Sequence, residues 1–207
     1  MAEKILYIGE TGVGKSRAIC KLDPKETILL KAIKKRLPSK IEKEYVLGKN
    51  MFLIESNAEL AKILKKLKEA KDLKGMKNIV IDDWSFLSAK ELMARTKELG
   101  FQKFSEVAEN IVKVLTAADN LQDELTVVFL SHTKVDENGD QILKTNSRFI
   151  EEKWGVVEQF EIVLLGNRDY SITTNGFPAK TPEGMFENTE IDNDMQMILD
   201  RIKEYYE

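Results

Sequence analysis

Short apolar runs alternate with amphipathic stretches along this chain, a pattern typical of an α/β protein with a largely parallel sheet flanked by helices. Continuous apolar runs predict strands at 5–8, 27–30, 51–54, 78–81, 125–130, 160–165 and 170–173. Apolar residues at helical spacing predict helices over 17–22, 85–99, 105–120 and 195–206, and another that begins with a cap at Asn57. Asn138-Gly139 predicts a tight turn that joins 134–135 to 142–143. We expect one domain over 1–207, with a small C-terminal extension of strand and helix from about residue 176.

One polar loop follows the first predicted strand and comes before the first predicted helix. Residues 9–16 read Gly-Glu-Thr-Gly-Val-Gly-Lys-Ser, which matches the phosphate-binding pattern G-x-x-x-x-G-K-[ST]. In such a loop the backbone N–H groups surround an anion, the lysine lies near the β- and γ-phosphates, and the serine hydroxyl binds Mg²⁺. The alternative is a Gly-rich turn between a strand and a helix. We therefore predict a site for ATP and Mg²⁺, with these residues around the phosphates: Glu10, Thr11, Gly12, Val13, Gly14, Lys15, Ser16 and Arg17.

Two acids follow the apolar run at 78–81. In P-loop NTPases an Asp at the end of a buried strand helps to hold Mg²⁺, so Asp82 is the expected metal ligand together with Ser16. We expect this strand to lie beside the strand at 5–8, because the acid must reach the metal. Asp83 could then orient or deprotonate the attacking water. The alternative for either acid is a cap on the following helix.

Two further polar residues end predicted strands. His132, the only histidine, follows the run at 125–130 and could donate a hydrogen bond to the γ-phosphate and report hydrolysis to the segment after it. Its alternative is a strand-end histidine bonded to a backbone carbonyl. Glu55 follows the run at 51–54 and could be the general base, or a surface charge at the start of a helix.

Several basic residues could act on phosphates outside the loop. Arg148, Arg168 and Lys180 are candidates for a finger that a neighbouring subunit inserts into the site. The segment 133–153, which leaves the predicted sensor strand, and the densely basic stretch 31–43 could each contact a nucleic-acid backbone. The alternative for both segments is a solvated surface.

Composition narrows the compartment more than the function. The chain has 207 residues, a formal net charge of −3 and a single cysteine, Cys20, so a disulfide framework is excluded and a reducing cytoplasm is expected. No apolar run reaches membrane-spanning length, and no signal peptide comes before the first predicted strand. The balance of charges neither indicates nor excludes a nucleic-acid partner.

The motifs together resemble a known family. They are the loop at 9–16, Ile-Asp-Asp-Trp at 81–84, Phe-Leu-Ser-His-Thr at 129–133, Ala-Lys-Thr-Pro-Glu-Gly-Met-Phe at 179–186, Ile-Asp-Asn-Asp at 191–194 and Tyr-Tyr at 205–206. In these segments the chain resembles small bacteriophage P-loop ATPases labelled AAA-domain proteins, which look like a minimal RecA-like core linked to single-strand annealing and recombination. The resemblance implies ATP binding by residues 12–16, Mg²⁺ near Ser16 and Asp82, self-association into a ring or filament, and single-stranded DNA as partner.

The resemblance also carries two departures. RecA-like proteins place a catalytic Glu after the strand that follows the phosphate-loop helix, where this chain has Lys31, and a Gln where it has His132. Three functions therefore stay open. The first is an ATPase that acts on single-stranded DNA with phage recombination or replication proteins in the host cytoplasm. The others are a nucleotide-gated switch with little turnover and a phosphotransferase acting on a small metabolite.

Overall fold

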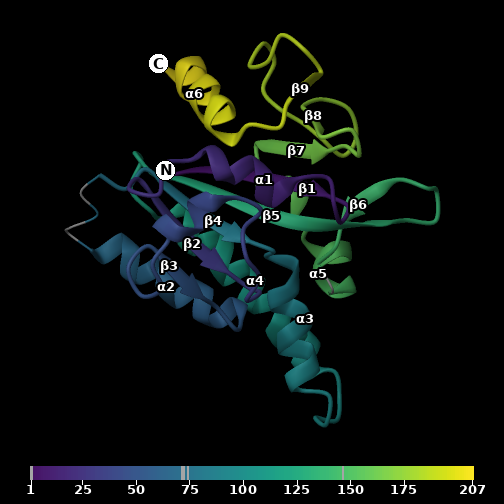
Figure 1. The fold of residues 1–207 in the computed structure, drawn as a ribbon. Helices are drawn as coiled ribbons and strands as arrows, with labels where there is room; N and C mark the ends of the chain where they lie inside the picture. Colours follow the sequence, from purple (N-terminus) through teal and green to yellow (C-terminus); the bar gives the residue numbers. More distant parts are fainter. Residues whose placement is uncertain (1, 71–72, 74, 146) are drawn as a thin grey trace.

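A nine-stranded mixed sheet, most of it parallel, runs through the chain and carries helices on both faces (Figure 1). This computed structural model describes residues 2–70, 73, 75–145 and 147–207. The strands are β1 (Glu3–Gly9), β2 (Thr27–Lys31), β3 (Met51–Leu53), β4 (Asn78–Asp82), β5 (Thr126–Val135), β6 (Gln141–Leu143), β7 (Ile162–Gly166), β8 (Ser171–Thr173) and β9 (Glu190–Asp192). The α-helices are α1 (Lys15–Ala18), α2 (Asn57–Glu69), α3 (Ser85–Ala94), α4 (Gln102–Asp119), α5 (Arg148–Lys153) and α6 (Met195–Tyr206). The 3₁₀ turns are η1 (Ile19–Lys21), η2 (Lys40–Glu44) and η3 (Val157–Gln159).

The strand order corrects one expectation from the sequence. The order is β3-β2-β4-β5-β1-β7-β8-β9, with β6 paired to β5, and the first six of these strands are parallel. The strand that ends in Asp82 therefore does not lie beside β1, because β5 pairs with both strands and separates them. The long apolar run of β5 is buried on both faces, as a central strand requires. All the parallel strands still end at one side of the sheet, which we call its carboxyl end.

Alternate residues of β1 enter two different cores. Ile5 and Tyr7 pack with α1, η1 and α6 on one face, whereas Leu6 and Ile8 pack with α2 and α4 on the other. This follows from the period of two along a strand, which turns successive side chains to opposite faces. Burial on both faces fixes the register of β1 with its neighbouring strands, and so fixes where the loop after β1 begins.

Several predicted elements are confirmed and others are shorter or start elsewhere. The hairpin at Asn138-Gly139 is confirmed by the pairing of β5 with β6, and the C-terminal helix coincides with α6. The helix expected over 17–22 is only the four residues of α1 followed by η1, and Pro24 disfavours its continuation. The helix cap expected at Asn57 is Ser56, whose hydroxyl accepts from the Glu59 N–H.

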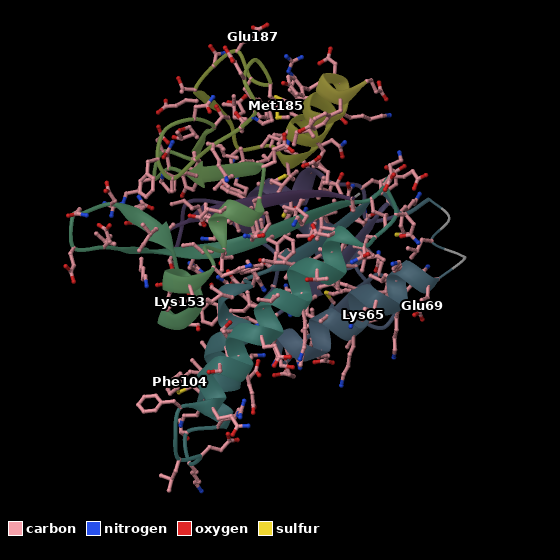
Figure 2. All side chains as sticks on the ribbon, turned by 180° about the vertical axis from the view of Figure 1, so that it is seen from behind. Lys65, Glu69, Phe104, Lys153, Met185 and Glu187 are labelled. Carbon is pink, nitrogen blue, oxygen red and sulfur yellow. The ribbon has the colours of Figure 1, made fainter. Side chains whose placement is uncertain are left out.

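Two surface regions also differ from expectation. The helix expected over 85–99 ends at Ala94, and the connection to α4 forms the end of a helical hairpin that projects from the body (Figure 1). Its large apolar side chains are exposed, Leu99 by 98% and Phe101 by 86%, and Phe104 points outward there (Figure 2). The basic stretch 31–43 is not a solvated surface throughout, because Leu37, and Tyr45 just after the stretch, are buried in the core beside α1.

Candidate nucleotide site

The loop between β1 and α1 turns back on itself at the carboxyl end of the sheet. Gly12 and Gly14 have φ values of 93° and 91°, which belong to the left-handed region that glycine adopts without strain. Ala18 and Arg17 donate their N–H groups to the Gly14 carbonyl, so α1 begins directly at the loop. The sequence match at 9–16 therefore has the strand–loop–helix context that a phosphate-binding loop needs.

Lys15 is a buried cation held by the loop that precedes it. Its side chain is only 6% exposed, and its Nζ donates to the carbonyls of Gly9 at 2.7 Å and Glu10 at 2.8 Å. Burial lowers the pKa of Lys15 to about 8, although the nearby carboxylates of Asp83 and Asp82 act in the opposite direction. A buried ammonium whose hydrogen bonds go to neutral carbonyls is incompletely compensated, and an anion would be a stronger direct partner.

Ser16 and Asp82 are in contact even though β5 lies between β1 and β4. The Ser16 hydroxyl donates to Asp82 Oδ1 at 3.3 Å, and Lys31 pairs with Asp82 in the register of β2 with β4. Burial, followed by the charge of Asp83, raises the pKa of Asp82 to about 6. A cation beside this carboxylate would lower its pKa again.

The same pair fits Mg²⁺ by its donor chemistry. Mg²⁺ prefers oxygen ligands and is usually bound by one or two protein oxygens together with substrate phosphates and waters. Ser16 and Asp82 supply one hydroxyl and one carboxylate. In the described part of the chain no group of three or more His, Cys, Asp or Glu could hold a metal by itself. The oxygens of a bound phosphate would therefore have to complete the coordination.

Asp83 and His132 contact each other beside Lys15. Asp83 has a φ of 63°, a left-handed conformation that is uncommon outside glycine but that Asp tolerates better than most residues. His132 Nε2 lies 3.0 Å from Asp83 Oδ1, and His132 Nδ1 lies 3.4 Å from Lys15 Nζ. With a proton on Nε2, His132 would donate to Asp83, and its Nδ1 would accept from Lys15. The predicted strand end at His132 is wrong, because β5 continues to Val135.

A pocket of about 220 Å³ opens on the outer side of this cluster. It is lined by Glu10, Thr11, Ser85, Phe86, Ala89, His132, Thr133 and Lys144. The pocket thus joins the loop to the start of α3 and to the β5–β6 hairpin. It is the space in which a phosphate at the loop would meet the imidazole of His132.

The C-terminal part of the chain holds the loop from behind, through a residue that sequence reasoning missed. Asn193 Nδ2 donates to the Gly14 carbonyl at 3.1 Å and to the Val13 carbonyl at 3.4 Å, and its Oδ1 accepts from Tyr7 OH at 2.9 Å. A Cβ at Gly14 would lie 2.4 Å from Asn193 Nδ2, so glycine is required by this contact as well as by its φ. The Asn-Asp pair before α6 was the available signal, since Asp194 is the helix cap.

The other residues expected around the phosphates lie on the loop or its flank. Val13 is buried and Thr11 is exposed. Arg168 donates to Glu10 Oε2 at 2.9 Å within one chain, and its side chain is 85% exposed. Arg17 lies over the Tyr170 ring, 5.5 Å from its centroid. Both contacts tie the loop to the β7–β8 turn.

Glu55 and Lys180 lie away from the loop of their own chain. Glu55 follows β3, from which three strands separate β1, roughly 19 Å at the usual strand spacing. Its carboxylate is 74% exposed and pairs with Lys90 at 2.8 Å, which matches its alternative as a surface charge. Lys180 pairs with Val163 near the start of β7, whereas the loop is level with the end of that strand. The side chain of Arg148 lies outside the described part of the structure.

The comparisons with protein families and with curated proteins found no match. Among the described residues, no helix has both the length and the apolar character needed to cross a membrane.

Proposed function

We propose that the chain is a RecA-like P-loop ATPase that binds ATP and Mg²⁺ at residues 9–16. The observation that carries this proposal is the pair of contacts made by consecutive loop residues. Lys15 is a buried ammonium whose hydrogen bonds within the described residues go to two backbone carbonyls and an imidazole, and Ser16 contacts the buried carboxylate of Asp82. A triphosphate with Mg²⁺ would give Lys15 an anion and Asp82 a cation in direct contact, in addition to the more distant charges that already act on them.

In this mechanism Lys15 exchanges the carbonyls of Gly9 and Glu10 for oxygens of the β- and γ-phosphates. Ser16 and Asp82 would hold Mg²⁺, which would neutralise part of the phosphate charge. Asp83 orients the attacking water and accepts its proton. His132 holds that carboxylate through Nε2 and reaches Lys15 through Nδ1, so one imidazole connects the base to the phosphate-binding lysine.

We also propose single-stranded DNA and a second copy of the chain as partners, with phage recombination or replication proteins as the wider context. The Lys144 N–H donates to the His132 carbonyl at 2.9 Å, so the β5–β6 hairpin is attached directly to the phosphate side of the site. The exposed apolar end of the α3–α4 hairpin supports self-association, because such side chains gain most from burial against another protein.

A nucleotide-gated switch with little turnover is the second candidate. It is favoured by the position of Glu55, which is far from the loop and paired with Lys90, so that Asp83 is the remaining base among the residues expected from the sequence. A phosphotransferase is less well supported. The arginines expected in a substrate lid are scattered, and Arg168 is paired with Glu10.

Phosphate release tests these candidates directly. Purified protein is incubated with ATP and Mg²⁺, with and without a single-stranded oligonucleotide, and compared with Lys15→Ala and with the exposed control Lys65→Ala. The proposal expects release that rises with the oligonucleotide, is lost in Lys15→Ala and is kept in Lys65→Ala. Tight ATP binding without release would favour the switch. Release of phosphate only to a small metabolite acceptor would favour the phosphotransferase.

A further inference from the structure

A second, basic pocket lies at the carboxyl end of the sheet, beyond β4 from the nucleotide loop. Its volume is about 310 Å³, and it is lined by Lys31, Lys34, Lys35, Arg36, Glu42, Leu47, Met51 and Leu53. It sits where β2 and β3 end, and β2 is three strand steps from β1, about 14 Å at the usual spacing. Ligands of open α/β sheets bind outside this end of the strands.

The segment that carries the cations is anchored to the fold. Lys31 is buried, and its Nζ donates to the Lys35 carbonyl. The Ala32 N–H donates to the Asp82 carbonyl at 3.0 Å, and the Leu37 N–H donates to Glu42 Oε2 at 2.9 Å. Both ends of the run from 32 to 37 are therefore fixed, so its basic side chains start from a defined backbone rather than from a free tail.

The three cations on this segment are exposed and form no ion pair within the described residues, although the charge of Lys35 acts at longer range on Asp82 and Lys15. Lys34, Lys35 and Arg36 are exposed, and among the described residues none of them makes an ion pair. The one acid in the pocket, Glu42, already accepts from the Leu37 N–H. Some other surface cations of the described part are paired, for example Lys77 with Glu26 at 2.7 Å. The segment thus concentrates positive charge in a chain whose net charge is −3.

Three of the residues that line the pocket are apolar. Leu47 is 62% exposed, and Met51 and Leu53 are half-buried beside it. A ligand for this pocket would combine several negative charges with a flat or apolar body. Successive phosphates of a nucleic-acid strand, with an unstacked base between them, have this chemistry. A duplex keeps its bases stacked inside, so it could offer the pocket its phosphates alone.

We infer that this pocket binds single-stranded nucleic acid, with Lys34, Lys35 and Arg36 on successive phosphates and a base against Leu47, Met51 and Leu53. The inference rests on the proposed function for the identity of the partner and places that partner away from the β5–β6 hairpin. The Ala32 N–H donates to the backbone carbonyl of Asp82. The basic segment is therefore hydrogen-bonded to the same residue whose carboxylate is the proposed metal ligand.

Fluorescence anisotropy with a labelled 15-nucleotide oligothymidylate tests the inference. The variant K34A/K35A/R36A is compared with K62A/K65A/K66A, which removes three exposed lysines from α2, where Lys65 points away from the sheet (Figure 2). Both variants change the net charge equally. Three lost phosphate contacts predict an affinity roughly 100-fold lower at about 0.1 M salt and a slope of log K against log salt that is shallower by about 2. The α2 variant should stay within about twofold of the wild type.

Each other outcome bears on the inference. Equal losses in both variants would attribute binding to overall charge, and no wild-type binding would remove the site; either result overturns it. Thymidine monophosphate is also compared with unlabelled oligonucleotide at the same concentration as a competitor. Equal displacement of the labelled oligonucleotide by both would overturn the inference and indicate a small-molecule site. A duplex that competes as well as the single strand would likewise overturn it. If the triple variant does not fold, the single variants Lys34→Ala and Arg36→Ala should each reduce the slope by about 0.7.

Calorimetry with ATP and Mg²⁺ on the same protein separates this inference from the proposed function. Nucleotide binding without oligonucleotide binding overturns only the inference. Oligonucleotide binding that depends on Lys34, Lys35 and Arg36, without nucleotide binding, supports the inference and contradicts the proposed function.

Discussion

Lys15 and the cations at 34–36 lie at the same end of one sheet but in opposite physical states. Lys15 is 6% exposed, has its hydrogen bonds arranged in advance, and has a pKa lowered to about 8 by burial. The cations at 34–36 are exposed and carry no ion pair among the described residues. A buried, positioned charge suits one anion of fixed geometry, whereas exposed charges suit a repeating anion and respond strongly to salt.

The two regions are also held in place by different contacts. The loop around Lys15 is clamped by Asn193, which is 179 residues away from Gly14. The basic segment is held by residues close to it in sequence and by β4. We therefore expect the nucleotide site to depend on the C-terminal extension, and the basic pocket to be independent of it. The predictions below test this contrast.

Lys15→Ala should give the largest effect. Two charge-assisted hydrogen bonds to phosphates are worth about 4 kcal/mol together, so ATP affinity should fall roughly 1,000-fold. Calorimetry measures the loss, and anisotropy measures oligonucleotide binding without nucleotide, which should change by less than about twofold. A parallel loss of both affinities would mean that the two regions are one site.

Asp82→Asn should stabilise the protein without ligand while it removes the effect of Mg²⁺. The folded pKa of Asp82 is raised to about 6, so the folded state is penalised as pH rises from about 4 to 6, by up to about 3 kcal/mol at pH 7. Asn removes that penalty, and the gain in unfolding free energy should shrink by about half at pH 5. Urea titrations at pH 7 and pH 5 measure it, and destabilisation at pH 7 would contradict this account.

Asn193→Ala should weaken the nucleotide site through the backbone of the loop. It removes the donor to the Val13 and Gly14 carbonyls and leaves the buried Tyr7 hydroxyl without its acceptor, at a cost of about 2 kcal/mol. The matched variant Tyr7→Phe removes only the hydroxyl and should cost less. ATP affinity should fall about tenfold in Asn193→Ala, with oligonucleotide affinity unchanged; unchanged ATP affinity would contradict a positioning role.

Glu55→Gln should have the smallest effect. The exposed pair with Lys90 is worth less than about 1 kcal/mol, and the residue lies three strands from β1. Phosphate release should stay within about twofold of the wild type, whereas Asp83→Asn should reduce it at least about tenfold. The opposite order would assign the base to Glu55 and require a rearranged β3.

Local patterns predicted the parts of this molecule that are set by local interactions. The motif at 9–16, the β5–β6 hairpin and α6 all follow from turn chemistry and periodicity within short windows. The strand order could not be predicted in this way, because β5 lies between β1 and β4 through long-range pairing. Asn193 was missed for the same reason, since its partners Tyr7, Val13 and Gly14 are at the other end of the chain.

Isothermal titration of ATP into the protein tests the central claim most directly, with Mg²⁺ present and then chelated. The account predicts one nucleotide bound per chain, weaker binding after chelation, and proton uptake of about half an equivalent near pH 8 as the phosphate returns Lys15 to its charged form. A flat titration with both ATP and GTP at millimolar Mg²⁺ would contradict it.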